Sequence, residues 1–304
     1  MPAGEDAGAP RVSVIVVAAD SGPALLECAA RALAGGVAVE FVLVDNASAD
    51  GMPEALERAH AGDARVRVLR NGANLGFGAA VNRGAAQARG EALLVLNPDC
   101  MLERDTLARL LAVLGAHPDA GPIGAVVCDA DGRPDPASRR RDPLLRRALM
   151  TLTGLAAREA RDARFAGVNV PGPMPRGVER EEAVSGALML LPRRVFEALG
   201  GFDEGYFLHC EDLDLCRRAR DAGYAVLLAG DVRVLHGKGG SSRHRPAFVA
   251  WHKHRGMWRW FRKFDPSARH PLPAGLVWLG LWAHYALLLP RYAFTAWRHR
   301  RRAA

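Results

Sequence analysis

The hexapeptide Val12-Ser13-Val14-Ile15-Val16-Val17 is an almost continuous run of β-branched side chains. A strand buried on both faces, as in a parallel sheet, has this composition, whereas a strand with one solvated face alternates apolar and polar residues. Residues 41–44 are a second candidate strand of this kind, and residues 66–69 and 92–96 are candidates for a third and a fourth strand. The sequence therefore predicts a mostly parallel sheet in the N-terminal part of the chain.

Helices are expected between these strands, at residues 23–33, 53–61 and 79–88. Strands that alternate with helices imply right-handed crossovers, so the fold class is α/β, with a mostly parallel central sheet flanked by helices. In open sheets of this kind ligands bind beyond the carboxyl ends of the strands. Asp45 and Asp99 follow two of the predicted strands at this edge.

The second half of the chain begins with a stretch of weaker pattern. Residues 129–182 show no clear hydrophobic period and contain many Pro, Gly and Arg residues, so we expect a long, partly mobile insertion over the acceptor side of a site. Residues 183–191 are predicted as one strand, 192–199 as a helix and 224–228 as a later strand.

Charge and tryptophan are concentrated near the C-terminus. The 304 residues carry a net charge of +8, yet residues 233–304 hold fifteen Lys and Arg against a single acid, Asp265, and all six tryptophans. Basic charge with interfacial aromatic residues points to an anionic membrane surface or an anionic substrate. Nucleic acid is the competing interpretation, but the sequence has no helix-turn-helix, zinc-finger or RNA-binding signature, and no nucleic-acid partner is expected.

Cysteine usage and the N-terminus indicate a cytoplasmic protein. The cysteines are odd in number and lack paired metal or redox spacing, so they are expected to be reduced, buried packing residues. They are Cys28, Cys100, Cys128, Cys210 and Cys216. Residues 1–10 lack the charged start and apolar run of a secretory signal and are predicted to be a disordered tail.

Six short motifs follow one another along the chain. They are Val44-Asp45-Asn46-Ala47-Ser48, the glycine-rich stretch 74–84, Asn97-Pro98-Asp99, Gly200-Gly201-Phe202-Asp203-Glu204, Glu211-Asp212-Leu213-Asp214-Leu215-Cys216, and Val234-Leu235-His236 before a Gly-rich run. In order and spacing they resemble the inverting glycosyltransferases of family 2, which have the GT-A fold, and especially the bacterial rhamnosyltransferase-like members. The resemblance covers about residues 11–265.

The resemblance implies a division of the chain. A GT-A domain is expected at residues 11–245, with a nucleotide-binding half at 11–128 and an acceptor-side half at 129–245. Residues 246–304 then form a basic, Trp-rich, helical region.

The resemblance also implies residues that bind the donor nucleotide. Asp45 would accept hydrogen bonds from a pyrimidine base or a ribose hydroxyl, although aspartate is equally common at turns and helix caps. Asn46 accompanies it. Gly76 allows the backbone to approach a phosphate closely, and Asn82 and Arg83 supply polar groups on the following helix; a glycine turn of this kind is a weak signal by itself.

A divalent metal, Mg²⁺ or Mn²⁺, is the implied cofactor. Asp99 stands where the family usually has the second acid of Asp-x-Asp, and Asn97 replaces the first. One carboxylate can suffice, because such a cation also takes phosphate oxygens and water. His236 is implied as a second ligand. Lys238 and Arg243, in the Gly-rich loop after it, would neutralise the diphosphate as the loop closes and excludes water.

Three carboxylates cluster at Glu211, Asp212 and Asp214, at an apparent helix start. The helix dipole favours acids there, which explains one of them but not obviously all three. Asp212 matches the family's catalytic base, which deprotonates the acceptor hydroxyl and leads to inversion. Glu211 would point toward the acceptor or a nearby arginine. Asp214 is expected to cap the helix or to pair with Arg217 or Arg218.

The C-terminal region is predicted to contact the membrane. Residues 251–264 interleave aromatic and cationic side chains, as in a helix that lies in the lipid headgroup layer. Residues 272–289 form an apolar run of borderline length for a membrane span. The alternative is a buried helix packed on the catalytic domain. Arginines between Arg298 and Arg302 would add attraction to an anionic surface.

We therefore predict a membrane-associated enzyme at the inner face of the plasma membrane. It would move a sugar, with dTDP-rhamnose as the expected donor, to a lipid-linked or polysaccharide acceptor of the cell envelope. Two alternatives stay open. A nucleotidyltransferase that makes nucleotide sugars would need a basic, glycine-rich N-terminal signature, which residues 18–22 lack. A catalytically silent membrane-binding scaffold would show no turnover.

Overall fold

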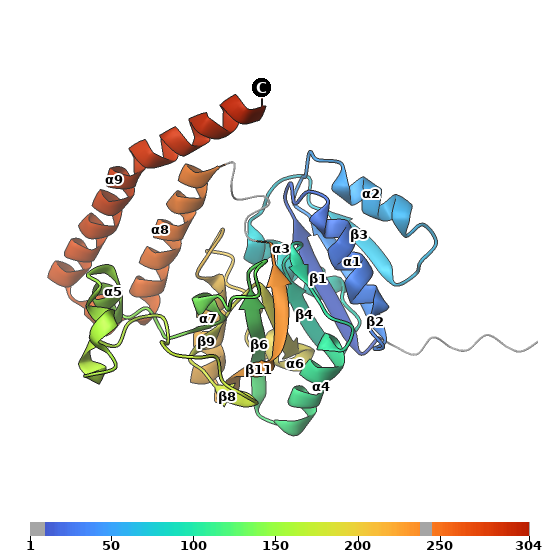
Figure 1. The fold of residues 1–304 in the computed structure, drawn as a ribbon, viewed down its shortest axis with the longest axis horizontal. Helices are drawn as coiled ribbons and strands as arrows, with labels where there is room; N and C mark the ends of the chain where they lie inside the picture. Colours follow the sequence, from blue (N-terminus) through green and yellow to red (C-terminus); the bar gives the residue numbers. More distant parts are fainter. Residues whose placement is uncertain (1–9, 238–244, 304) are drawn as a thin grey trace, which may run out of the picture.

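A central sheet organises the molecule (Figure 1). The computed structural model describes residues 10–237 and 245–303. In this part of the chain nine strands form one sheet, in the order β3-β2-β1-β4-β10-β6-β11-β5 with β8 paired to β11, and β7 and β9 form a small second sheet. The strands are β1 (Val12–Ala18), β2 (Val39–Asp45), β3 (Val66–Arg70), β4 (Ala92–Leu96), β5 (Cys100–Met101), β6 (Ala120–Cys128), β7 (Arg139–Arg140), β8 (Val178–Arg180), β9 (Ala183–Val184), β10 (Leu188–Pro192) and β11 (Ala225–His236).

Helices cover both faces of this sheet (Figure 1). The α-helices are α1 (Ala24–Ala34), α2 (Met52–Ala59), α3 (Phe77–Gln87), α4 (Thr106–Ala116), α5 (Leu145–Leu152), α6 (Arg193–Ala198), α7 (Glu211–Asp221), α8 (Pro246–Phe264) and α9 (Pro271–Ala303). Short 3-10 turns are η1 (Pro136–Ser138), η2 (Leu155–Arg158), η3 (Ala163–Phe165) and η4 (Pro266–Arg269).

Strand β1 shows why the sheet needs helices on both sides. All seven of its residues are buried. Because successive side chains of a strand point to opposite faces, Val14 and Val16 pack in one core with Leu25 of α1. Ile15 packs in the other core with Leu215 of α7. The continuous apolar composition that predicted a doubly covered strand is thus confirmed.

The sheet is parallel in its N-terminal half and mixed beyond it. β1 pairs in parallel with β2 and β4, and β2 with β3. β10 is antiparallel to both of its neighbours, β4 and β6, whereas β11 and β6 are parallel. The fold is the α/β arrangement with a mostly parallel sheet that the sequence predicted.

The predicted strand at residues 183–191 is wrong as a single element. It is divided into β9, which pairs with β7 in the small sheet, and β10, which lies in the central sheet. Residues 185–187 connect the two sheets, and they line a cleft. The predicted strand at 224–228 is the start of the longer β11, whose last residue His236 pairs with Cys100 of β5.

The irregular segment at residues 129–182 contains short elements joined by ion pairs. Arg141 contacts Glu159 at 2.6 Å, and Arg147 contacts Glu182 at 2.6 Å. The first residue of α5, Leu145, donates its backbone N–H to Asp265 at 2.6 Å. The segment is therefore connected to α8 at one end of α5.

The C-terminal helices α8 and α9 lie side by side at one side of the molecule (Figure 1). The expectation that residues 251–264 rest in a headgroup layer is corrected for the inner face of α8, because Trp260 is fully buried in the core shared with α7. α9 differs, since its segment Pro271–Thr295 is long and apolar enough to cross a membrane and only 6% of its most apolar window is buried.

Candidate active site

A cleft of about 1210 Å³ opens beyond the carboxyl ends of the parallel strands. Residues far apart in the sequence line it, including Asp99, Glu211, Asp212 and His236. The carboxyl ends of β1, β2 and β4 all lead to this edge because these strands are parallel. The expected convergence of distant acids and a histidine on one cleft is therefore observed for Asp99, Asp212 and His236.

Asp45 ends β2 but is buried and does not itself line the cleft. Its Oδ1 accepts a hydrogen bond from the backbone N–H of Ser48 at 2.8 Å, as in the turn that was the alternative interpretation. The next residue, Asn46, lines the cleft and donates its amide to the carbonyl of Gly76 at 3.1 Å. Asp45 thus shapes the turn that presents Asn46.

Gly76 lines the cleft at a position that admits no side chain. Its φ is +88°, and an added Cβ would lie 2.6 Å from the carbonyl oxygen of Phe207. The neighbouring Phe77 donates its N–H to the same oxygen at 2.8 Å. The glycine is therefore required for close packing of the α3 start against the segment before α7.

Asn82 and Arg83 lie away from the cleft. The Asn82 side chain bonds both backbone groups of Phe202, at 2.8 and 2.9 Å, and Glu204 at 2.9 Å. It therefore fastens the loop 200–204 to α3. Arg83 is exposed on α3.

Asp99 and His236 meet in the cleft, where His236 Nε2 lies 3.0 Å from Asp99 Oδ1. Asn97 Nδ2 lies 3.2 Å from the same ring nitrogen. Among residues 10–237 and 245–303 no group of three or more His, Cys, Asp and Glu side chains is close enough to hold a metal alone. A carboxylate and an imidazole can hold Mn²⁺ or Mg²⁺ when phosphate and water complete the coordination. Lys238 and Arg243 lie outside the described residues.

The acidic motif begins α7 in an unusual backbone setting. His209 and Cys210, just before the helix, both have positive φ, +69° and +72°. This conformation is costly for residues with a side chain and is often found at functional sites. It turns the chain so that Glu211 and Asp212 line the cleft while Leu215 lies in the core.

Asp212 is held by three donors. Its carboxylate accepts hydrogen bonds from the guanidinium of Arg140, from the backbone N–H of Gly186 at 3.1 Å and from its neighbour Leu213 at 2.8 Å. Burial alone would raise the pKa of Asp212, but the Arg140 charge and these hydrogen bonds together lower it. Asp212 is therefore ionised at neutral pH.

Glu211 has the opposite electrostatic character. Its side chain is buried, and Oε2 has no hydrogen-bond partner among the described residues. Burial, followed by the negative charge of Asp212, raises the pKa of Glu211. Two adjacent carboxyl groups with pKa values pushed apart can take different roles, one as proton acceptor and the other as hydrogen-bond donor.

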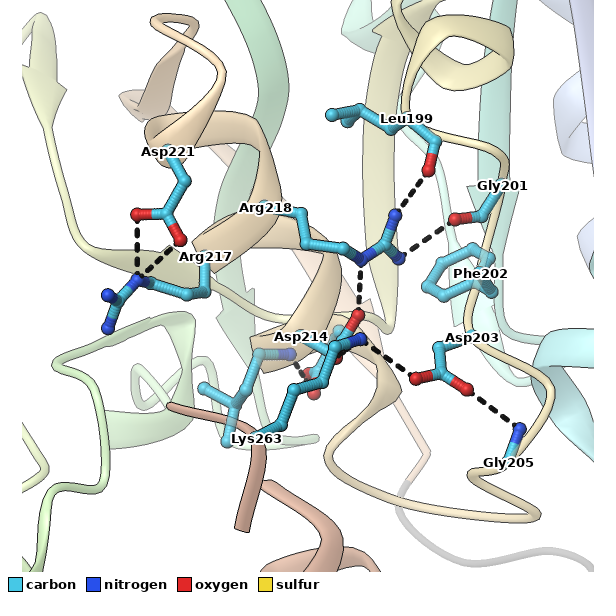
Figure 2. A network of polar contacts seen from close by, with 12 residues as sticks. Leu199, Gly201, Phe202, Asp203, Gly205, Asp214, Arg217, Arg218, Asp221 and Lys263 are labelled. Atoms are coloured by element: carbon cyan, nitrogen blue, oxygen red, sulfur yellow. Dashed lines mark hydrogen bonds and ion pairs between the residues drawn. The ribbon is translucent and has the colours of Figure 1, made fainter. Parts of the chain in front are cut away.

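Asp214 faces away from the cleft and joins α7 to α8 (Figure 2). Its fully buried carboxylate pairs with Arg218 at 2.5 Å, as predicted, and with Lys263 at 2.6 Å. Lys263 also contacts Asp203 at 2.8 Å, and Arg259 contacts Asp203 at 2.8 Å. Although burial opposes it, Arg259 and Lys263 lower the pKa of Asp203 to about 2.

Residues that sequence reasoning gave no role complete the cleft. Arg140 belongs to a run of three arginines, residues 139–141, that no motif singles out, and residues 251–264 of α8 were expected to face the membrane. The structure places Arg140 against Asp212 and lines the cleft with Lys253 and Met257 of α8. The five cysteines are free and buried, as predicted.

Comparisons with known proteins bear on the family and the fold of the chain. Residues 13–170 match the family model described as glycosyl transferase family 2. An N-acetylglucosaminyl-diphospho-decaprenol L-rhamnosyltransferase of Mycobacterium tuberculosis is 33% identical over 278 residues, which cover 81% of this chain and 86% of that protein.

Two solved structures share the fold. The mannosyltransferase PcManGT from Pyrobaculum calidifontis, in complex with GDP-Man and Mn²⁺, aligns with a TM-score of 0.58 and 22% identity over 94% of this chain and 73% of its own. GalNAc-T7 with UDP, GalNAc and Mn²⁺ aligns with a TM-score of 0.59 and 19% identity over 84% of this chain and 48% of its own.

Proposed function

Since the chain belongs to glycosyltransferase family 2 and has the GT-A fold, we propose that it transfers rhamnose from a nucleoside-diphosphate donor to a lipid-linked acceptor, with inversion. The choice of sugar and acceptor is supported by the mycobacterial relative, which is named for both. The observation that carries the proposed chemistry is the ionised Asp212 inside the same cleft as Asp99 and His236.

Asp212 is the proposed general base. Its carboxylate is ionised at neutral pH and lies in the cleft, so it can take the proton from an acceptor hydroxyl as that oxygen attacks the anomeric carbon. Attack from the face opposite the departing diphosphate inverts the anomeric centre. Arg140 and the N–H of Gly186 hold the carboxylate in place before the acceptor arrives.

Glu211 is assigned a supporting role. Because its pKa is raised, it keeps its proton at neutral pH and cannot compete as the base. A protonated carboxyl group in the cleft wall can instead donate a hydrogen bond to an acceptor oxygen.

The donor is proposed to bind in the part of the cleft that is lined by residues from the N-terminal half of the chain. Asn46 and Gly76 line this part of the cleft. The Asn46 amide is held in place, since it donates to the carbonyl of Gly76 and accepts from Asn71 at 2.6 Å, and Asp45 fixes the turn behind it. Asn82 and Arg83 are proposed to act indirectly, since neither lines the cleft. Lys238 and Arg243 remain predicted counter-charges for the diphosphate.

Asp99 and His236 are the proposed holders of a divalent metal. When bound, such a cation neutralises charge on the departing nucleoside diphosphate. The Mn²⁺ present in two structures of the same fold supports this assignment.

Membrane association is proposed to occur through α9. Its apolar segment is largely unburied in the fold, and a lipid-linked acceptor would be reached at the membrane surface. This supports a location at the inner face of the plasma membrane.

Replacing the base tests the function. Asp212→Asn is expected to lower transfer by about 10²-fold or more while nucleotide binding persists. Asp221→Asn, at the exposed far end of the same helix, is the matched control and should leave turnover unchanged. Initial rates with dTDP-rhamnose and a decaprenyl-diphosphate-linked N-acetylglucosamine measure both. A wild-type protein that neither transfers nor hydrolyses any nucleotide sugar would support the silent scaffold instead.

A further inference from the structure

The acceptor side of the cleft is lined by two helices from different parts of the chain. α5 contributes Ala148, Thr151 and Leu152, which share one helical face. Val249, Lys253 and Met257 come from α8, at four-residue intervals that likewise place them on one face. These two helical faces border a common space, which we call the α5–α8 groove.

The groove is closed at one end. Leu145, at the start of α5, packs against Phe261 of α8 and donates its N–H to Asp265 just after α8. No comparable contact joins Leu152 to α8 among the hydrogen bonds of the described residues, and Leu152 is 70% exposed. The helices therefore meet at one end and leave the other side of the groove open.

The groove combines apolar walls with positive charge. Val249, Leu152 and Met257 are apolar, whereas Lys253 and Arg245 are exposed cations that line the same cleft. In the part of the chain that is described, no acid forms an ion pair with Lys253. A cation that forms no ion pair with the described residues, on the wall of an apolar groove, favours a ligand that brings its own negative charge.

Lys253 is also held close to the catalytic helix. Three residues further along α8, an added Cβ on Gly256 would lie 2.7 Å from the His209 carbonyl oxygen, so α8 packs tightly against the turn before α7. His209 lines the cleft and is exposed there. Partial desolvation by the surrounding protein, followed by the charge of Lys253, lowers its pKa. Because Lys253, His209 and Asp212 line the same cleft, the Lys253 charge lies within reach of a ligand that approaches Asp212.

We propose that the α5–α8 groove is the acceptor site and that it binds an amphiphile, with phosphate groups of the acceptor at Lys253 and its hydrocarbon chain along Leu152 and Met257. The proposal rests on the proposed glycosyl transfer and deepens it, because it names the residues that distinguish a phosphorylated lipid from a neutral polysaccharide. α9 packs beside α8, so its largely unburied apolar segment adjoins one of the two helices of the groove.

The first test concerns the charge. In detergent solution the full chain is assayed with N-acetylglucosaminyl diphosphate linked to decaprenol, and with an alkyl N-acetylglucosaminide that lacks phosphate. Lys253→Ala should raise KM for the diphosphate acceptor by about tenfold or more and leave KM for the glycoside and for the donor unchanged. Lys253→Arg should restore most of the loss. Arg255→Ala is the matched control, because Arg255 is exposed on the same helix but does not line the cleft.

The second test concerns the hydrocarbon chain. Leu152→Ser should lower kcat/KM by about tenfold for the decaprenyl acceptor but not for an acceptor with the same diphosphate and a short alkyl chain. Leu149→Ser, on the same helix and 45% exposed but outside the cleft, is the control. Equal losses for the paired variants, or equal losses for charged and neutral acceptors, would overturn the proposed site. Donor hydrolysis that persists in that case would leave the glycosyltransferase function standing, whereas its absence in the wild type would remove that function itself.

Discussion

Arg140 of β7 forms an ion pair with Asp212 of α7 inside the cleft, and both side chains are largely buried. Arg140 also donates to the carbonyl oxygen of Val184 at 3.1 Å, which fixes the guanidinium on the small sheet. The proposed base is therefore oriented by a strand from the irregular acceptor-side segment as well as by the N–H of Leu213 in its own helix. A change in that segment can alter catalysis without touching a substrate.

Arg140→Gln is expected to shift the pH dependence of the reaction. The charged and titratable groups around Asp212 are Arg140, Glu211, His209, Lys253, Cys210 and Cys216. Without the Arg140 charge and its hydrogen bond, burial dominates, so the pKa of Asp212 rises. Because the ionised form is the active base, the acid limb of the kcat/KM profile should move to higher pH.

If the pKa of Asp212 rises by one, the acid limb of the kcat/KM profile moves to a tenfold lower proton concentration. At a pH below the limb, kcat/KM should then be about tenfold lower than in the wild type, and it should recover at alkaline pH. Arg140→Lys should shift the profile less, because it retains a cation. A uniform loss at every pH, with no movement of the limb, would contradict the assigned role.

Metal dependence provides the next prediction. Asp99→Asn and His236→Ala should each raise the Mn²⁺ concentration needed for half-maximal transfer by about tenfold or more, since each removes one of two protein ligands. Titration of EDTA-treated enzyme with Mn²⁺, followed by transfer rate and by spin resonance of bound Mn²⁺ with nucleoside diphosphate, measures this. Asp105→Asn, an exposed aspartate before α4, should behave as wild type. Full activity of wild type in EDTA would refute the metal assignment.

Lys263→Met should destabilise the fold. Lys263 bridges the buried Asp214 and the partly buried Asp203, and its loss leaves both carboxylates with fewer donors (Figure 2). The free energy of unfolding should fall by about 2 kcal/mol, the range of a hydrogen bond to a charged group. Arg262→Met, next to it and 5.7 Å from the Trp258 ring centroid, should change urea unfolding by less than half as much. Equal effects would mean that the Asp214 bridge adds no stability.

The sheet was predictable because its information is local. The doubly buried composition of β1, β2 and β4 follows directly from residues 12–17, 41–44 and 92–96. The division of residues 183–191 was missed, although Ser185-Gly186 between the two apolar parts is a local signal for a break in the strand. The pairing of β9 with β7 shows that the first part belongs to another sheet.

The residues of the candidate site that belong to a sequence motif were predicted. Those that reach the cleft only through the folding of the chain were missed. Asp99, Asp212 and His236 came from motifs, and they do meet in one cleft. Arg140 and Lys253 lie in runs of cations that resemble a solvated surface, so no local pattern sets them apart. The interleaved cations and aromatic residues of α8 are compatible both with contact to lipid and with packing on the catalytic domain. The burial of Trp260 shows that the inner face of α8 packs on the domain.

Substitutions on α9 test the proposed membrane contact. Leu279 and Leu287 are 57% and 79% exposed, so Leu279→Glu with Leu287→Glu should not disturb folding. Burial of each leucine in lipid would contribute about 1.5–3 kcal/mol, so losing both should weaken binding to vesicles by about 10²-fold. Cosedimentation with vesicles that contain anionic lipid measures this. Leu75→Glu, an equally simple change at a 43% exposed leucine outside α9, should bind like wild type. Undiminished binding of the α9 variant would show that another surface makes the contact, since both substituted positions lie in the one described segment that is apolar and long enough to span a bilayer.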